Sequence, residues 1–410
     1  MMSPPHIVIV GAGLAGLRTA ERARRQGHEG RITLVGVEHH APYDRPPLSK
    51  SLLISPEELA PVALRVAEAY AELDLDLRTG HAAMSLDTVG KTVTLSDRDR
   101  VRYDRLVIAT GARPRRIEAF MRPAGAHVVR TWEDSQALRA ELHAERHGRR
   151  PQVTVIGGGV LGCEVAASAR SIGLEVHLVE ALGTPLGRVL GDEVGQAVAA
   201  LHRDHGVHVH APATVASVEG SQHVESVELA DGTSIPTDVL LVAVGAAPNT
   251  EWLDGSLLVV DDGVVCDATG TSSDGDVLAV GDVARMPHPR HAGAHRLEHW
   301  TNAVDTAALV GVNALLDPPA RGPLTEVPYF WSDQYDAKIQ CLGLASPADA
   351  LRVVDGSLGE RRFLALYHRE GVVTGAVSIG RPGPLARCRG IVATGASLDD
   401  VLAEPPWVRR

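Results

Sequence analysis

The residues Gly11-Ala12-Gly13-Leu14-Ala15-Gly16 form a G-x-G-x-x-G motif directly after the apolar run of residues 7–10. In this motif the first glycine allows a tight turn, the second lets a pyrophosphate approach the backbone, and the third packs a helix closely on a strand. The first amide groups of that helix favour an anion. Glu38 lies 22 residues beyond Gly16, the distance at which an acidic side chain bonds ribose hydroxyls. The pattern predicts a dinucleotide site.

The same arrangement recurs later in the chain. An apolar run at residues 153–156 leads into Gly157-Gly158-Gly159-Val160-Leu161-Gly162, and Glu180 lies 18 residues beyond it, after a second run at residues 176–179. Glu180 would bond a free 2′-hydroxyl and repel a 2′-phosphate. Because the next arginine downstream, Arg188, is eight positions away, the pattern favours NADH over NADPH. We call residues 11–16 and 157–162 the first and second fingerprints. Two fingerprints predict two bound dinucleotides.

Charged residues outside the fingerprints have two interpretations each. Residues 42–47 contain three prolines, which predict a stiff loop rather than a helix. The loop would carry Arg45 and Lys50 as positioned cations, or as ordinary solvated ones. Gly281 and Asp282 follow an apolar run at residues 277–280. Asp282 would accept a hydrogen bond from a sugar or ribityl hydroxyl, or would cap a helix.

Apolar runs and helical periodicity predict the elements that position these residues. Buried strands are expected at residues 7–10 and 105–110, and further strands at 31–36, 153–156, 176–179, 224–229 and 239–244. Helices are expected after each fingerprint and at residues 62–72. From about residue 324 the composition shifts toward aromatic residues and strand-like runs, which predicts a short further domain.

Composition restricts the classes of function. The 410 residues are 44% hydrophobic and 22% charged, with a net charge of −11, as in globular proteins and unlike a nucleic-acid binder, which needs a basic surface. No apolar run approaches the ~18 residues that cross a bilayer. The four cysteines, Cys163, Cys266, Cys341 and Cys388, include no C-x-x-C. We therefore expect a cytoplasmic protein with no nucleic acid, membrane or metal partner.

The longer motifs identify a resemblance. The order GAGLAG, YDRPPLSK, LVIATGARPR, VIGGGVLGCEVA, VGAAPN, AVGDVA, RLEHWTNA and YFWSDQYD resembles the FAD-dependent, NADH-using ferredoxin reductases that serve bacterial cytochromes P450 and ring-hydroxylating dioxygenases. The resemblance runs from residue 6 to about residue 383. RPPLSK, EHW and FWSDQYD are its specific parts, and the stretch after residue 383 has no diagnostic motif.

The resemblance implies an α/β, glutathione-reductase-like fold. It would have two Rossmann-type dinucleotide-binding domains and, in addition, a smaller α+β C-terminal domain. The implied division is an FAD domain in two segments, 1–114 and 241–323, a NAD domain at 115–240, and a C-terminal interface domain at 324–410.

The resemblance also implies roles for individual residues. Ala83 would lie at the adenine with Arg130 nearby, and Trp300 and Trp331 would line the flavin ring, which Arg45 and Lys50 would flank. The implied FAD-binding residues are Gly11, Gly13, Leu14, Ala15, Gly16, Glu38, Arg45, Lys50, Ala83, Ala109, Thr110, Gly111, Arg130, Gly281, Asp282, Glu298, His299, Trp300 and Trp331. Those implied for NADH are Gly157, Gly159, Val160, Leu161, Gly162, Glu180 and Gly245.

The activity that follows is electron transfer from NADH through FAD to a [2Fe-2S] ferredoxin, and from there to a P450 or dioxygenase, by a monomer or weak homodimer. Lys50 and Glu164, the latter close to the nicotinamide, are the catalytic candidates in supporting roles, since no protein nucleophile or general base is required. One alternative is reduction of rubredoxin or another one-electron carrier. Another is a binding or signalling flavoprotein similar to apoptosis-inducing factor. A peroxide- or oxygen-reducing enzyme would need a cysteine beside the flavin, and none precedes Cys163.

A basic segment near the C-terminus predicts the surface that meets the carrier. Residues 361–389 contain one acidic residue, Glu370, against six arginines: Arg361, Arg362, Arg369, Arg381, Arg387 and Arg389. Such a segment would steer an acidic ferredoxin. The alternative is a set of arginines dispersed in solvent.

Overall fold

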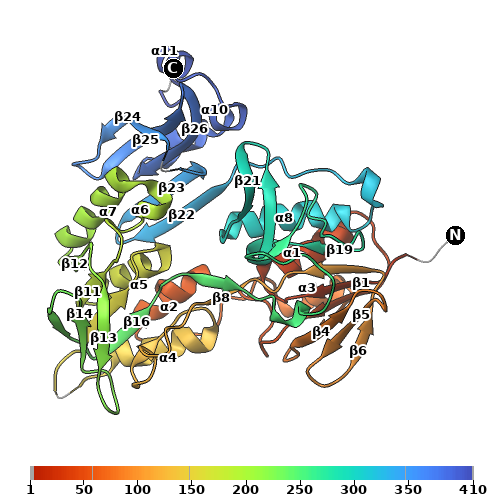
Figure 1. Cartoon of the computed structure of the whole chain (residues 1–410), viewed down its shortest axis with the longest axis horizontal. Coiled ribbons are helices and arrows are strands. Elements are labelled where there is room, and N and C mark those ends of the chain that lie inside the picture. Colours follow the sequence, from red (N-terminus) through yellow and green to blue (C-terminus); the bar gives the residue numbers. More distant parts are fainter. Residues whose placement is uncertain (1–3, 58, 147, 347, 409–410) are drawn as a thin grey trace. The chain divides into compact units, whose positions relative to one another are not determined.

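The computed structural model describes residues 4–408 except 58, 147 and 347, and the chain forms two compact units (Figure 1). Unit 1 comprises the described residues of Met1–Asp44, Pro61–Arg113 and Ala247–Glu326. Unit 2 comprises those of Arg45–Ala60, Pro114–Ala246 and Val327–Arg410. The chain passes between them in two paired strands, β8 (Ala112–Pro114) and β17 (Ala246–Pro248). The four-segment domain division implied by the resemblance stays a prediction.

Unit 1 is built on a parallel sheet. Its strand order is β19 (Val277–Ala279), β7 (Arg105–Ile108), β1 (Ile7–Val10), β2 (Ile32–Val35) and β3 (Leu75–Arg78). Val8 and Val10 of β1 join one hydrophobic cluster, while Ile7 and Ile9 join the other. Because both faces of this strand are covered, its residues are all apolar rather than alternating.

Helices and small sheets cover the central sheet of unit 1. Helix α1 (Leu14–Arg25) packs against α8 (Trp300–Asn313), and Tyr70 of the short α3 (Ala67–Glu72) packs on the hydrophobic cluster to which α1 contributes. One antiparallel sheet contains β4 (Ala83–Asp87), β5 (Thr92–Leu95) and β6 (Arg100–Arg102). Another sheet contains β18 (Val264–Val265), β20 (Ala284–His288) and β21 (His291–Arg296). The 3-10 turns are η2 (Glu251–Leu253), η3 (Gly281–Val283) and η4 (Pro318–Ala320).

Unit 2 repeats the parallel arrangement. Its strand order is β12 (His208–His210), β11 (Glu175–Val179), β10 (Gln152–Ile156), β16 (Val239–Val242) and β9 (Ala126–His127). A smaller antiparallel sheet contains β13 (Val215–Glu219), β14 (Ser226–Leu229) and β15 (Ser234–Pro236). The helices are α4 (Trp132–His143), α5 (Val160–Ser171), α6 (Gly187–Leu190) and α7 (Asp192–Asp204).

The C-terminal part of unit 2 is an antiparallel sheet with helices. The strand order is β22 (Tyr329–Gln334), β23 (Ala337–Gly343), β26 (Val372–Ile379), β25 (Arg362–Arg369) and β24 (Ala350–Ser357). Three short helices follow: α9 (Pro382–Arg387), α10 (Arg389–Thr394) and α11 (Leu398–Ala403). Leu364, Leu366 and Val373 form its core with Leu385 and Trp407.

Two expectations about local structure were wrong. The helix expected at residues 62–72 is reduced to α3, because residues 62–64 are extended and pair with residues 42–44: Asp44 donates its N–H to Val62 and Leu64 donates to Pro42. The proline loop contains the 3-10 turn η1 (Pro46–Ser49), followed by α2 (Ser51–Ile54). Pro46 and Pro47 occupy the first turn of η1, where a missing N–H costs nothing.

Candidate functional site

The first fingerprint of unit 1 combines two glycines that the fold requires with one that it does not. Gly11 has φ +118°, and a Cβ there would lie 2.1 Å from the Ala109 carbonyl oxygen. A Cβ on Gly16 would lie 2.0 Å from the Gly11 carbonyl oxygen. A Cβ on Gly13, in contrast, would meet nothing within 4 Å. The backbone at Gly13 is therefore open to the approach of another molecule.

The start of α1 suits a phosphate group. The N-cap residue of this helix is Gly13, and no side chain caps the helix. Its first turn, which lies within the described residues, contains no acidic side chain. The first amides of a helix lack partners within the helix and carry the positive end of its dipole. Leu14 and Ala15 form this first turn, against which Gly281 packs: a Cβ on Gly281 would lie 3.0 Å from the Ala15 Cβ. An anion would complete this terminus.

The other candidates of unit 1 lie where parallel strands end. Glu38 follows β2 and accepts a hydrogen bond from the Tyr43 hydroxyl at 2.5 Å. Ala109, Thr110 and Gly111 follow β7, and Gly281 and Asp282 follow β19. Carboxyl ends of parallel strands share one edge of the sheet, which is where such sheets bind ligands. Unit 1 therefore brings these residues to one edge, together with the first fingerprint.

Three further candidates of unit 1 lead into α8. His299 is the N-cap residue of this helix, and burial lowers its pKa to about 4. Trp300 donates from Nε1 to the Asp44 carboxylate at 2.8 Å. Glu298 bonds the Arg296 guanidinium at 2.5 Å. Ala83 opens β4, a different sheet of the same unit.

The second fingerprint, in unit 2, has the same geometry. A Cβ on Gly157, where φ is +106°, would lie 2.3 Å from the Ala243 carbonyl oxygen, and a Cβ on Gly162 would lie 1.9 Å from that of Gly157. Gly159, the N-cap residue of α5, again has open space where a Cβ would project. Val160 and Leu161 form the first turn of α5, which has no acidic residue. Unit 2 therefore offers a second phosphate-binding helix terminus.

Glu180 is held directly against this second fingerprint. Its Oε2 accepts the Gly158 N–H at 2.6 Å, and its Oε1 accepts the Leu182 N–H at 2.7 Å. Two backbone amides thus fix the carboxylate beside the glycine loop, and each oxygen retains a lone pair for a further donor. This position fits a ribose hydroxyl next to a pyrophosphate. Gly245 follows β16 in the same unit.

Lys50 and Glu164 form an ion pair within unit 2. Glu164 is 5% exposed, and its Oε2 lies 2.8 Å from Lys50 Nζ and accepts the Ser49 hydroxyl at 2.7 Å. Its Oε1 accepts the Ser332 hydroxyl at 2.8 Å. A buried carboxylate is tolerated when it is paired and hydrogen-bonded in this way. Sequence reasoning missed both serines, although they lie within the motifs RPPLSK and FWSDQYD.

Arg45, Arg130 and Trp331 also belong to unit 2. Arg45 donates from its guanidinium to the Arg130 carbonyl oxygen, and the Arg130 N–H bonds Asp134 at 3.0 Å. Trp331 donates from Nε1 to Asp333 at 3.1 Å. The residues implied for FAD are thus divided: those of the first fingerprint and of α8 lie in unit 1, whereas Arg45, Lys50, Arg130 and Trp331 lie in unit 2.

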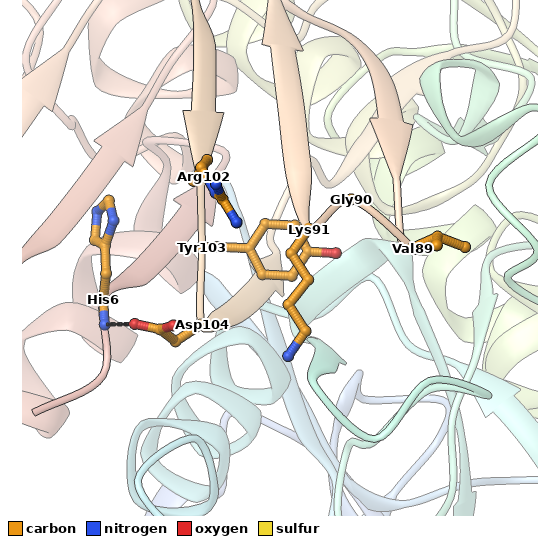
Figure 2. Close-up of a pocket in the computed structure, with 7 residues that line it drawn as sticks. All are labelled: His6, Val89, Gly90, Lys91, Arg102, Tyr103 and Asp104. Atoms are coloured by element: carbon orange, nitrogen blue, oxygen red, sulfur yellow. Dashed lines mark hydrogen bonds between the residues drawn. The ribbon is translucent and has the colours of Figure 1, made fainter. Parts of the chain in front are cut away.

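A hollow of about 260 Å³ in unit 1 lies away from these residues. Figure 2 shows its lining and the bond of 2.7 Å from the His6 N–H to Asp104. His6 precedes β1 and Asp104 precedes β7, so the hollow lies at the amino ends of these strands. Because ligands of such sheets bind at the carboxyl ends, we do not assign a dinucleotide to it.

The described residues also bear on membrane attachment and on cysteine chemistry. None of the helices in this part of the chain has the length and apolar character needed to span a bilayer. All four cysteines are buried and unbridged. Burial raises the pKa of the Cys163 and Cys266 thiols, so neither is an activated nucleophile.

Two family descriptions match this chain, one over its first three quarters and one over its C-terminal part. Residues 5–307 match the family described as pyridine nucleotide-disulphide oxidoreductase, and residues 329–407 match the family described as reductase C-terminal. This chain belongs to the pyridine nucleotide-disulphide oxidoreductases. The resemblance to ferredoxin reductases and the expected α/β fold class, with two Rossmann-type sheets and a smaller C-terminal part, are confirmed.

Several ferredoxin reductases of this family are similar over nearly the whole chain. Rhodocoxin reductase of Rhodococcus erythropolis is 35% identical, over 95% of this chain and 89% of its own. The ferredoxin–NAD(+) reductase component of the biphenyl dioxygenase system of Paraburkholderia xenovorans is also 35% identical, over 96% and 94%. The reductase in the covalent putidaredoxin reductase–putidaredoxin complex has a TM-score of 0.91 and 32% identity, over 98% of this chain and 97% of that chain.

Proposed function

We propose that this chain is an FAD-dependent NADH:ferredoxin oxidoreductase that passes electrons to a [2Fe-2S] ferredoxin serving a cytochrome P450 or a ring-hydroxylating dioxygenase. The observation that carries the proposal is the pair of open helix termini at Gly13 and Gly159, each following a glycine turn and a buried strand. The names of the similar reductases supply the carrier class.

The residues of both units fit the two cofactors. The edge of unit 1 with Gly11, Gly13 and Glu38 would hold the FAD pyrophosphate and ribose, and that of unit 2 with Gly159 and Glu180 would hold NADH. FAD, when bound, takes electrons in pairs as a hydride and passes them on singly, which a one-electron carrier requires. The other cofactor residues implied by the resemblance stay part of the proposal.

Lys50 and Glu164 would assist by charge and position rather than by covalent chemistry. Glu164 lies two residues beyond Gly162 on α5, so it follows directly from the fingerprint that would hold NADH. Its three side-chain partners fix the carboxylate in one geometry. Lys50 supplies the matching positive charge. Electrostatic groups fixed in advance act without reorganisation during the reaction.

The test of the function is an anaerobic titration of the purified holoprotein with NADH, followed by addition of candidate carriers from the same genome. We expect about one FAD per chain, because unit 1 has one fingerprint. Stoichiometric bleaching by NADH should then be followed by reduction of a [2Fe-2S] ferredoxin. Reduction of rubredoxin alone would favour the other carrier class. Slow bleaching with a long-lived charge-transfer complex would favour a signalling flavoprotein.

A second test addresses the choice of nucleotide. Wild-type protein should be reduced far faster by NADH than by NADPH, because Glu180 repels a 2′-phosphate. Glu180→Gln keeps an acceptor for the Gly158 or Leu182 N–H while removing the charge, so we expect the preference to narrow by roughly 10-fold, about 1.4 kcal/mol. Glu180→Ala combined with Ala181→Arg should turn the nucleotide preference toward NADPH, because an arginine there can accommodate a 2′-phosphate. Equal rates with both nucleotides in the wild type would contradict the role of Glu180.

We also propose a cytoplasmic location and a monomer or weak homodimer. The location is supported by the use of NADH and by four buried cysteines that form no disulfide, as is usual in a reducing compartment.

A further inference from the structure

Strands β12 and β11 form one edge of the parallel sheet in unit 2 (Figure 1), and together they carry four polar residues of interest. In the register of β11 with β12, His177 pairs with His208 and Val179 pairs with His210. Glu175 precedes His177 by two residues. Since side chains alternate along a strand, Glu175, His177, His208 and His210 project from the same face. We call these four residues the edge histidine cluster.

Three members of the cluster already lie close together. His177 Nε2 is 3.6 Å from Glu175 Oε1, and the rings of His177 and His208 stack with centroids 4.6 Å apart. One donor atom from each of Glu175, His177 and His208 lies within 4.8 Å of the other two. Among the residues that the structure describes, this is the one group of three histidine, cysteine or acidic side chains placed so.

The fourth member, His210, lies against the second ring nitrogen of His177. His177 Nδ1 lies 3.0 Å from His210 Nε2. A proton on His177 Nδ1, donated to His210, leaves the lone pair of His177 Nε2 directed toward Glu175 and available to a metal. Metal-binding histidines in proteins are typically oriented by a hydrogen bond from the other ring nitrogen.

We propose that Glu175, His177 and His208 form a site for a borderline divalent cation, Zn²⁺ foremost, with His210 positioning His177. Two imidazoles and one carboxylate are ligands that Zn²⁺ accepts, with water in the fourth position. Tetrahedral bonds of ~2.1 Å require donor atoms ~3.4 Å apart, so the three groups must close by about an ångström. The Glu175 side chain is 50% exposed; its Oε2 accepts from the Gln152 side-chain amide at 2.9 Å, and its Oε1 faces His177. His208 is exposed, so its ring can rotate toward the other two ligands. Mg²⁺ and Ca²⁺ prefer oxygen ligands and should not bind.

A cation here would join β12, an edge strand, to β11. Glu180 directly follows β11, and its N–H donates to the carbonyl oxygen of His210, the last residue of β12, at 2.9 Å. His177 precedes Glu180 by three residues, about 10 Å along the strand. The proposal does not depend on the proposed redox function, because it concerns side chains outside both fingerprints.

The test is zinc binding to the metal-depleted, FAD-loaded full-length protein, measured by equilibrium dialysis with elemental analysis, beside amide hydrogen exchange. We expect about one zinc per chain and slower exchange of the β11–β12 amides with Zn²⁺ but not with Mg²⁺. His177→Gln and His208→Gln should abolish this binding. His210→Gln should weaken it roughly 10- to 100-fold, as for other groups that orient a ligand.

Matched controls separate this site from adventitious binding. His81→Gln removes an imidazole that has one carboxylate neighbour, Asp97 at 3.2 Å, and should leave zinc stoichiometry unchanged. Circular dichroism and retained FAD would show that each variant is folded. The proposal is overturned if the wild type binds no zinc, or if His177→Gln and His208→Gln bind it as the wild type does.

Discussion

Glu164 is a buried carboxylate, and Lys50 is its ion-pair partner. The sequence left Lys50 as either a positioned or a solvated loop cation, and the structure pairs it at 2.8 Å with a carboxylate that is almost fully buried. Removing one partner of such a pair leaves an uncompensated charge, which costs about 3–5 kcal/mol. Lys50 is therefore structural as well as a candidate electrostatic group.

Lys50→Met should lower both the unfolding free energy and the reduction potential of the flavin. The resemblance assigns Lys50 to the flavin ring, and loss of a nearby cation disfavours the negatively charged reduced form. We expect a shift of a few tens of millivolts, on the order of 1–2 kcal/mol for a two-electron couple. Spectroelectrochemistry measures the potential, and denaturant unfolding measures the stability.

Two further variants separate these effects of Lys50. Lys50→Met with Glu164→Gln removes both charges and should recover much of the stability, as in a double-mutant cycle. Ser49→Ala removes one hydrogen bond to Glu164 without changing the charge, and should leave the potential in place. If Lys50→Met is destabilised but keeps the wild-type potential, Lys50 serves only as the partner of Glu164.

At the scale of elements, the beginning of α1 has two glycines with different tasks, Gly13 at the N-cap and Gly16 within the helix, and alanine substitutions distinguish them. Gly13→Ala adds a methyl group in open space, so the fold should tolerate it while FAD binding weakens at least ~10-fold, because the pyrophosphate needs that approach. Gly16→Ala would bring a Cβ to 2.0 Å from the Gly11 carbonyl oxygen, and should cost about 1–3 kcal/mol of stability. Flavin titration and urea unfolding measure the two outcomes. Equal effects on both properties would argue against this division.

Helix α7 contains a histidine that makes stability depend on pH. His202 is fully buried, its Nδ1 lies 3.0 Å from the Tyr335 hydroxyl, and burial lowers its pKa to about 4. Because this folded-state pKa lies below the unfolded value of about 6.5, the neutral side chain favours folding above pH 6.5. That contribution, roughly 3 kcal/mol, is lost as the pH falls from about 6.5 to about 4.

Urea unfolding between pH 7.5 and pH 5 tests the role of His202. His202→Gln should unfold more easily at pH 7.5 but lose less stability on acidification than the wild type. His81→Gln replaces a histidine that is only partly buried and serves as the control for the loss of one imidazole. An unchanged dependence in His202→Gln would assign the acid sensitivity to other groups.

The elements also show which features the sequence could predict. The buried strands of the two parallel sheets were predictable, because burial on two faces favours apolar residues at successive positions, as in β1 and β16. The group of side chains around Glu164 could not be predicted, because Ser49 and Ser332 come to it from distant segments of the chain. The edge histidine cluster escaped for the same reason: His177 and His208 become neighbours only through the register of β11 with β12. Periodicity does not encode such pairing.

At the scale of the whole molecule, charge determines how a carrier would approach. The basic segment at residues 361–389 is less positive than its sequence suggests. Arg361 contacts Asp204, Arg369 lies 2.8 Å from Asp349, and Arg381 lies 3.3 Å from Asp355. Arg387 donates to the Trp407 carbonyl oxygen at 2.7 Å, so reversing its charge would disturb the C-terminal core. Arg362 and Arg389 are exposed. We test Arg389, which lies over the Tyr329 ring and donates to the Val327 carbonyl oxygen at 3.3 Å.

Arg389→Gln and Arg389→Glu should slow ferredoxin reduction in that order, by about 2- to 5-fold at low salt, if this arginine steers an acidic carrier. The difference from wild type should shrink toward 0.15 M ionic strength, where the Debye length is about 8 Å. Reduction of FAD by NADH should stay near the wild-type rate, because it involves no carrier.

Arg102→Glu is the control: it makes the same charge reversal at the hollow on the amino ends of the unit 1 strands, and we expect no loss of ferredoxin reduction. Stopped-flow reduction across a salt series measures all four proteins. Identical rates and salt slopes for wild type and Arg389→Glu would place the docking surface elsewhere.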